Sequence, residues 1–306
     1  MKLLLAFLIS CITMVSQARD LVLITPNTPG STSDIAAKAI AEAYHNRTGH
    51  KILVENIGGG HQIPAVNAWK SRPSATVLMT TTGILVFNPK LRDNLPYDDK
   101  DFDHVTMIAA APSVWVVRNE SSYRTMHDLV KNLPKSAKPF VAYANYPEVV
   151  NLNLLQKKYG WATNEITAVK DRGVPEAVIG IIEGSIEVGI LTINSGVVEQ
   201  IRAGRLRALA TTHNQDLDIA GSKIPPASRV LDVEQFNGGI FLSLRTGLPA
   251  ATAEKIKSDL ITSVGDPLVA ERLRSQNQTV INRGPDHMKD FIKDFRDRIS
   301  TMRFEQ

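Results

Sequence analysis

Two short loops rich in glycine, serine and threonine are the part of this sequence whose residue types could bind a ligand. The first, PNTPGSTSD at residues 26–34, follows an apolar run at 21–25, and the second, IGGGHQ at 57–62, follows the run at 51–56. A helical pattern of apolar residues begins after each loop. Free N–H groups and the positive end of the helix dipole converge at such a helix start. Both loops therefore favour an anion, which glycine lets approach closely and which hydroxyl groups can contact.

Neither loop carries a nucleotide-binding motif. The pattern G-x-x-x-x-G-K-[ST] does not occur, and Gly58-x-Gly60-x-x leads to Ile63 instead of a third glycine. On spacing alone, a Gly/Ser loop before a helix is more often only a turn, and this alternative stays open. We interpret Asp34 as the helix cap, a role that needs no ligand because the first-turn N–H groups are its partners.

The remaining reactive side chains do not form a catalytic or metal-binding pattern. None of the 7 histidines is spaced as H-x-x-x-H or H-E-x-x-H, and G-x-S-x-G is absent. The aspartates at 98, 99, 101 and 103 follow Pro96 in a polar segment, which a solvated loop or helix start explains better than acid/base catalysis. His61 is the one histidine placed where a ligand could reach it. We therefore expect no metal, no cofactor and no enzymatic activity.

Composition and charge exclude some classes of partner. The chain has 306 residues, 43% hydrophobic and 22% charged, with a formal net charge of +4 and no run of basic residues. Nucleic acid is therefore not expected as a partner. At about 100–200 residues per domain, this length predicts two domains.

The N-terminus has the pattern of an export signal. Residues 1–18 carry one lysine and then an apolar run, and Ser16 and Ala18 form a small-x-small cleavage site. Cleavage after Ala18 would remove Cys11, the only cysteine, and leave no disulfide. Alternatively, residues 8–11 (LISC) resemble a lipobox, which would attach a lipid to Cys11. We expect a periplasmic protein, with the lipid anchor as the alternative.

Strand-like runs alternate with amphipathic helical patterns along the chain. Strands are expected near residues 21–25, 51–56, 76–82, 114–117, 140–143, 166–169, 186–191, 206–212 and 239–244. Helices are expected near 35–46, 63–70, 125–132, 147–159, 174–183, 196–203, 249–264, 266–276 and 286–303. This alternation predicts an α/β fold with mixed, mostly parallel sheets and helices on both faces.

Several motifs, in order, resemble those of the periplasmic receptors of tripartite tricarboxylate transporters, also called the Bordetella-uptake-gene (Bug) family. The resemblance runs from Leu21 to about Phe295. The matching segments are PNTPGSTSD (26–34), VEN with GGG (54–60), NPKL (88–91), LPYD (95–98), DF (101–102), RGVPEAV (172–178) with EG (183–184), and IRAGRLRALA (201–210). The LPYD segment and the last one are the most specific.

The resemblance implies a two-lobed, flytrap-like fold of the type II periplasmic-binding class. One lobe would be discontinuous, formed by residues 19–112 and 236–306, and the other would comprise 113–235. The solute would be a small organic carboxylate, such as a di- or tricarboxylate or an acidic amino acid. The partners would be integral membrane permease subunits, and the receptor would be a monomer.

The resemblance also implies which residues bind the solute. Carried onto matching positions, these are Asn27, Thr28, Pro29, Gly30, Ser31, Thr32, Gly59, Gly60, His61, Thr81, Thr82 and Gly83 in the first lobe, and Ala144, Asn145, Tyr146, Arg172 and Gly173 in the second. Arg172 is the candidate for a direct charge partner, because a guanidinium group matches a carboxylate bidentately. Its alternative role is that of a surface arginine at a helix start.

Departures from the family pattern concentrate in the second lobe. In the first loop, Ser31 replaces a glycine and Asn27 replaces an aromatic residue. In the second lobe, the family's Y-G-S-S-G-x-G-S segment is reduced to YANYPE (143–148), without its glycines. Carboxylate capture is therefore expected to persist, whereas the rest of the solute is expected to differ. Two other functions remain as alternatives: a ligand sensor feeding a signalling membrane protein, and an exported α/β enzyme.

Overall fold

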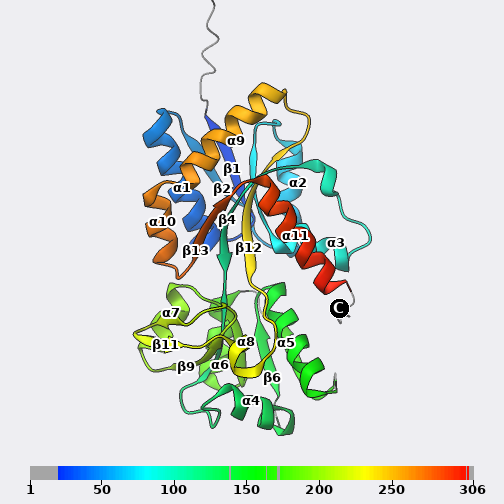
Figure 1. The fold of residues 1–306 in the computed structure, drawn as a ribbon, viewed down its shortest axis with the longest axis vertical. Coiled ribbons are helices and arrows are strands. Elements are labelled where there is room, and N and C mark those ends of the chain that lie inside the picture. The colour runs from blue at the N-terminus through cyan, green and yellow to red at the C-terminus, as the bar shows by residue number, and fades with distance from the viewer. Residues whose placement is uncertain (1–19, 138, 163, 171–172, 301, 303–306) are drawn as a thin grey trace, which may run out of the picture.

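The computed structural model describes residues 20–137, 139–162, 164–170, 173–300 and 302. It contains two lobes, each built on a β-sheet with helices on both faces (Figure 1). The two-lobed α/β fold expected from the sequence is thus confirmed. The expected signal peptide at 1–18, including Cys11, and the candidate residue Arg172 lie outside the described residues.

The first lobe is built on a six-stranded sheet of order β13-β4-β12-β3-β1-β2. Its strands are β1 (Leu21–Thr25), β2 (Ile52–Asn56), β3 (Val77–Thr81), β4 (Phe102–Ala111), β12 (Gly238–Arg245) and β13 (Thr279–Arg283). Three helices pack on one face: α1 (Thr32–Thr48), α9 (Ala250–Val264) and α10 (Pro267–Arg274). The other face is covered by α2 (Ile63–Ser71), η2 (Gly83–Phe87) and α11 (Pro285–Ile299). Short turns of helix complete it: η1 (Gly60–Gln62), α3 (Asn88–Leu91) and η3 (Asp99–Asp101).

The second lobe is built on a five-stranded sheet of order β7-β6-β8-β5-β9. Its strands are β5 (Ser113–Arg118), β6 (Phe140–Tyr143), β7 (Thr167–Lys170), β8 (Val188–Thr192) and β9 (Leu206–Thr211). One face carries α4 (Met126–Asn132), α5 (Tyr146–Tyr159) and α8 (Ala227–Leu231). The other carries α6 (Val174–Glu183), α7 (Ser195–Arg202) and the hairpin of β10 (Leu217–Ile219) and β11 (Ser222–Ile224). The turn η4 (Leu133–Lys135) follows α4.

Both sheets are mixed, as expected, and antiparallel pairs stand beside the parallel ones. The parallel pairs in the two large sheets are β1/β2, β1/β3, β6/β7 and β6/β8. The antiparallel pairs are β12/β3, β12/β4, β13/β4, β5/β8 and β5/β9. The physical reason is the passage between lobes: the chain leaves the first lobe along β4 and returns along β12, so these neighbours run in opposite directions. The sequence analysis missed β4 and β13 altogether.

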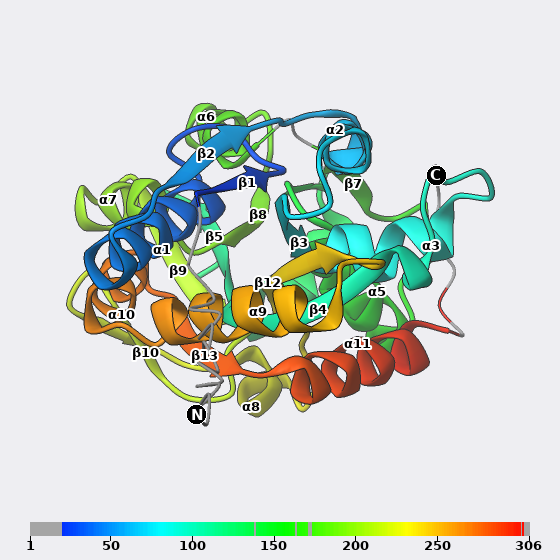
Figure 2. The same ribbon diagram turned by 90° about the horizontal axis from the view of Figure 1, so that it is seen from above.

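A buried asparagine fixes the returning chain against the second lobe. The Asn151 side chain on α5 donates to the carbonyl of Phe236 at 2.9 Å and accepts from its N–H group at 2.7 Å. Asn151 is fully buried. The same helix places Val150 in the first lobe's core, beside Phe236 and Phe87. Helix α5 therefore packs against both lobes on the side where β12 begins (Figures 1 and 2).

Replacing this asparagine by a residue of similar size should destabilise the protein. Asn151→Leu leaves the buried N–H and C=O groups of Phe236 without partners, and we expect the free energy of unfolding to fall by about 2–4 kcal/mol. Urea unfolding measures the change. Asn132→Leu is the matched control, because Asn132 is exposed at the end of α4, and it should cost about 0.5 kcal/mol or less. Equal costs for the two variants would contradict this role of Asn151.

Candidate ligand-binding site

The predicted ligand-binding residues lie at the carboxyl edges of parallel strands. The first-lobe residues follow β1, β2 and β3, which are neighbours in the sheet order β3-β1-β2. In the second lobe, residues 144–146 follow β6, and Gly173 follows β7, which pairs with β6. Ligands of open α/β sheets bind at this edge. The two groups of loops come into direct contact through His61, Tyr146 and Lys170.

The first loop is ordered by Ser31 and Asp34, with roles that differ from the expectation. Helix α1 begins at Thr32, and its N-cap is Ser31, whose hydroxyl accepts from the Asp34 N–H group at 3.3 Å. Asp34 is therefore not the N-cap as predicted. The reason is that serine is itself a preferred N-cap and stands one residue before the helix.

Asp34 instead holds the loop in place from within the first turn. Its buried carboxylate accepts from the Gly30 N–H group at 2.8 Å, from Asn56 Nδ2 at 3.0 Å and from Lys38 Nζ at 2.8 Å. Burial raises the pKa of Asp34, but the hydrogen bonds from Lys38, Gly30 and Asn56 outweigh it, so the net shift is downward. Gly30 has φ +82°, a conformation that favours glycine.

The helix start still offers free donors. Within the residues that the structure describes, the N–H groups of Thr32 and Ser33 have no hydrogen-bond acceptor, whereas those of Gly30 and Ser31 do. These two N–H groups belong to the first turn of a 17-residue helix, where the positive end of the dipole lies. An anion bound at this loop would therefore meet Thr32 and Ser33, not Gly30.

Gln62 ties the three first-lobe loops together. It donates through Nε2 to Asn27 Oδ1 at 3.0 Å, and its Oε1 accepts from the Thr81 hydroxyl at 2.5 Å. Asn27 in turn donates to the Ser33 hydroxyl at 2.8 Å. A Cβ on Gly83 would lie 2.9 Å from Gln62 Oε1, so glycine makes room for this link. The sequence analysis did not name Gln62, although its place next to His61 in the second loop was a usable signal.

A residue of the NPKL segment, Asn88, holds His61, and a residue of the LPYD segment, Tyr97, holds Asn88. Asn88 is fully buried and donates through Nδ2 to the His61 carbonyl at 2.9 Å and to the Tyr97 hydroxyl at 3.0 Å. The Tyr97 hydroxyl donates to the Ile84 carbonyl at 3.0 Å, and burial raises the pKa of Tyr97 to about 12. Tyr97 is therefore a neutral donor, and these motifs act by positioning the second and third loops.

In the second lobe, a buried glutamate occupies the loop that the resemblance assigned to the solute. Glu148 is fully buried, and its Oε2 accepts from the N–H groups of Ala144 and Asn145, both at 2.7 Å. Its Oε1 accepts from the hydroxyls of Thr192 at 2.8 Å and Ser113 at 3.2 Å. The amides of Ala144 and Asn145 are thus already bound to a carboxylate of the chain itself. The sequence analysis missed Glu148; the spacing N-x-x-E at a helix start, a capping box, was the available signal.

A cluster of His61, Tyr146 and Lys170 joins the two lobes. The Nδ1 atom of His61 lies 2.8 Å from the Tyr146 hydroxyl and 3.1 Å from Lys170 Nζ. Lys170 Nζ also lies 5.0 Å from the centre of the Tyr146 ring, which stacks on Phe87 with ring centres 5.0 Å apart. Burial, together with the charges of Lys170 and Arg92, lowers the pKa of His61. The sequence analysis named His61 and Tyr146 but not Lys170.

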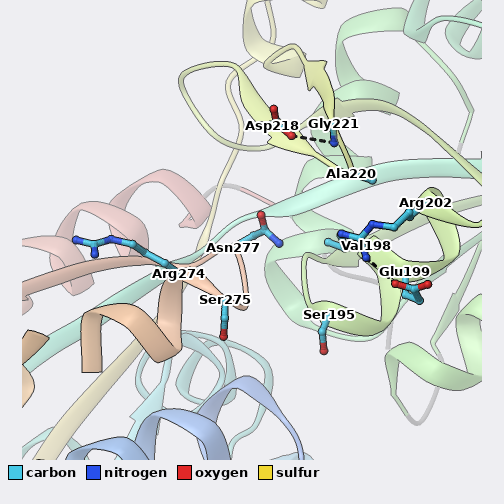
Figure 3. A pocket seen from close by; sticks show the side chains of 10 residues that line it. All are labelled: Ser195, Val198, Glu199, Arg202, Asp218, Ala220, Gly221, Arg274, Ser275 and Asn277. Carbon is cyan, nitrogen blue, oxygen red and sulfur yellow. Dashed lines mark hydrogen bonds and ion pairs between the residues drawn. The ribbon is translucent and has the colours of Figure 1, made fainter. Parts of the chain in front are cut away.

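A hollow between the lobes contains none of the predicted residues. It has a volume of about 360 Å³ and lies where α7 and the β10–β11 hairpin face the end of α10 (Figure 3). Its lining includes Glu199 and Arg202 on α7 and Arg274 on α10. Glu199 and Arg202 form an ion pair with each other.

Two further structural findings concern membranes and metals. In the described part of the chain, no helix is long and apolar enough to cross a membrane. Among the same residues, histidine, cysteine, aspartate and glutamate side chains form no group of three that could hold a metal ion.

The fold defines a class of protein. The structure resembles a protein from R. palustris solved with adipate, with a TM-score of 0.80 and 22% identity over 92% of this chain and 95% of that one. It also resembles the malate-bound MatC of Rhodopseudomonas palustris, with a TM-score of 0.76 and 19% identity over 92% and 97% of the two chains. The chain thus has the fold of the periplasmic solute-binding proteins.

Family membership follows from the sequence comparison. Residues 36–303 match the model of the tripartite tricarboxylate transporter family receptor, so the chain belongs to that family. A relative from Agrobacterium vitis, the UPF0065 protein in the TAR-I ttuE-ttuC' intergenic region, is 29% identical over 85% of this chain and 78% of its own length. The family resemblance inferred from the motifs is therefore confirmed.

Substitutions of Glu148 should separate its charge from its hydrogen bonds. Glu148→Ala leaves two amides and two hydroxyls without an acceptor and should lower the free energy of unfolding by about 2–4 kcal/mol. Glu148→Gln keeps one oxygen for the amides and offers an NH₂ group to the hydroxyls, so it should cost about 1 kcal/mol or less. Urea unfolding measures both, and an Ala variant as stable as the Gln variant would contradict the assignment.

Wild type and Glu148→Gln should differ in how their stability depends on pH. Burial raises the pKa of Glu148 above 4.5, against the opposing hydrogen bonds from Asn145, Thr192, Ala144 and Ser113. A carboxyl group with a raised pKa in the folded state holds its proton more tightly there, so lowering the pH through that pKa favours folding. The stability of wild type relative to Glu148→Gln should therefore rise as the pH falls from neutral toward 5. A difference that does not vary with pH would contradict the raised pKa.

Proposed function

We propose that this protein is an extracytoplasmic solute-binding receptor that captures a small organic carboxylate between its lobes and delivers it to a membrane permease. The observation that carries the proposal is the start of α1. There, the N–H groups of Thr32 and Ser33 have no acceptor within the described residues. Gln62 connects the neighbouring loops through its hydrogen bonds to Asn27 and Thr81. Family membership and the carboxylate-bound structural neighbours support the same class of solute.

The proposed mechanism is conformational and not catalytic. A solute that contacts both lobes stabilises the closed arrangement, and the permease binds that arrangement. The contact of His61 with Tyr146 and Lys170 marks one place where the lobes meet. In keeping with the export signal, we place the receptor in the periplasm. We also propose residues 19–112 with 236–306, and residues 113–235, as the two lobes that move.

Ligand binding can be tested by thermal and calorimetric titration of refolded protein. Unfolding and refolding first removes solute carried over from expression. A panel of mono-, di- and tricarboxylates and acidic amino acids should contain a compound that stabilises the protein by about 2.7 kcal/mol at one hundred times its dissociation constant. If no carboxylate in the panel raises the melting temperature, the proposed function is wrong.

A backbone substitution tests the proposed anion site itself. Thr32→Pro removes one N–H group at the first helical position, which proline favours, after Ser31, whose ψ of 161° suits a residue before proline. Loss of a charge-assisted hydrogen bond should weaken carboxylate binding about 10- to 100-fold without loss of stability.

Ala250→Pro is the matched control for this substitution. It also places proline at the first position of a helix, that of α9, and should leave affinity unchanged. Equal affinity in the Thr32→Pro variant and wild type would contradict the proposed site.

A further inference from the structure

The structure raises the question of where the second lobe would contact a solute anion. The loop before α5 is not available, because Glu148 already accepts from its two amides, those of Ala144 and Asn145, at 2.7 Å each. A solute carboxylate there would have to displace this buried side chain. The loop that the family resemblance assigned to the solute anion therefore already binds Glu148 of the chain itself.

A positive cluster lies at the neighbouring strand end. Lys170 is the last residue of β7, which pairs with β6 so that Lys170 stands opposite Tyr143, directly before the loop of Ala144 and Asn145. The end of β7 lies next to the loop that carries His61, because Lys170 Nζ lies 3.1 Å from His61 Nδ1. Lys170 thus stands at the same sheet edge as the amides that Glu148 occupies.

Among the described residues, no carboxylate balances the positive charge of Lys170. No carboxylate of the described residues forms an ion pair with Lys170 or Arg92. The Nε atom of Arg92 is buried and has no hydrogen-bond partner there. Partial removal from water and the charge of Arg92 lower the pKa of Lys170, and both cations lower that of His61. A cationic side chain that is partly removed from water and has no carboxylate partner among the described residues favours a bound anion.

We propose that Lys170, together with His61, binds a second anionic group of the solute. The first anionic group would lie at the N–H groups of Thr32 and Ser33 on the other lobe. The solute is then an elongated dianion that bridges the lobes, and Lys170 is the residue that distinguishes it from a monoanion. This inference rests on the proposed receptor function and assigns the selectivity of that same site.

The test compares dicarboxylates with monocarboxylates of the same chain length. Succinate, glutarate and adipate are paired with butyrate, pentanoate and hexanoate, and binding to refolded protein is measured by calorimetry. Lys170→Met removes the charge but keeps an unbranched chain against the Tyr146 ring. It should weaken binding of the best dicarboxylate about 10- to 100-fold and change binding of the matched monocarboxylate less than about 2-fold.

Three further variants make the result specific. Lys170→Arg should restore most of the affinity, because it keeps the positive charge. Arg92→Gln leaves Lys170 and His61 in place and should weaken dicarboxylate binding less than Lys170→Met does. Lys131→Met, on the exposed face of α4 at the far end of the second lobe (Figure 1), should bind like wild type. Melting temperatures of all variants confirm that they fold.

The outcomes separate this inference from the proposed function. If wild type binds no carboxylate at all, the proposed function and this inference both fail. If wild type binds dicarboxylates and Lys170→Met binds them equally well, the receptor function stands and this inference is overturned. It is also overturned if Lys170→Met weakens mono- and dicarboxylates by the same factor.

Discussion

The buried carboxylate of Glu148 is the interaction on which the geometry between the lobes depends. It joins the start of α5 to Ser113, where the chain enters the second lobe, and to Thr192 at the end of β8. A carboxylate inside a protein persists only when hydrogen bonds replace its hydration, and here four donors do so. This satisfied group fixes the loop of Ala144 and Asn145 and, next to it, the position of Tyr146 against the first lobe.

That constraint explains the asymmetry of the two lobes. In the first lobe, Asp34 takes the Gly30 amide but leaves those of Thr32 and Ser33 without an acceptor among the described residues. In the second, Glu148 takes both amides of the corresponding loop. An anionic solute is thus directed to backbone donors on one side and to cationic side chains, above all Lys170, on the other. The segment YANYPE lacks the glycines of the family pattern. This fits the use of side chains, instead of a flexible backbone, as the binding surface of the second lobe.

Apolar periodicity and loop composition, which are local signals, predicted the α/β class and placed the candidate loops at strand ends, and the family resemblance supplied the two lobes. The sequence did not predict β4, whose start lies in the polar segment around Asp101, nor the antiparallel pairing of β12, which depends on contacts between distant segments. Gln62, Glu148 and Lys170 were also missed. Local signals were available for Gln62, in its place in the second loop, and for Glu148, in the N-x-x-E spacing. The partners that give Gln62 and Lys170 their roles, Thr81 and His61, lie 19 and 109 residues away in the chain.

The most direct test of this account is a crystal structure of the refolded protein with the dicarboxylate that binds most tightly. The account predicts one carboxylate within hydrogen-bond distance of the Thr32 and Ser33 N–H groups, and the other within hydrogen-bond distance of Lys170 Nζ, with Glu148 still bound to Ala144 and Asn145. A ligand elsewhere, or a carboxylate that displaces Glu148 from those amides, would contradict it.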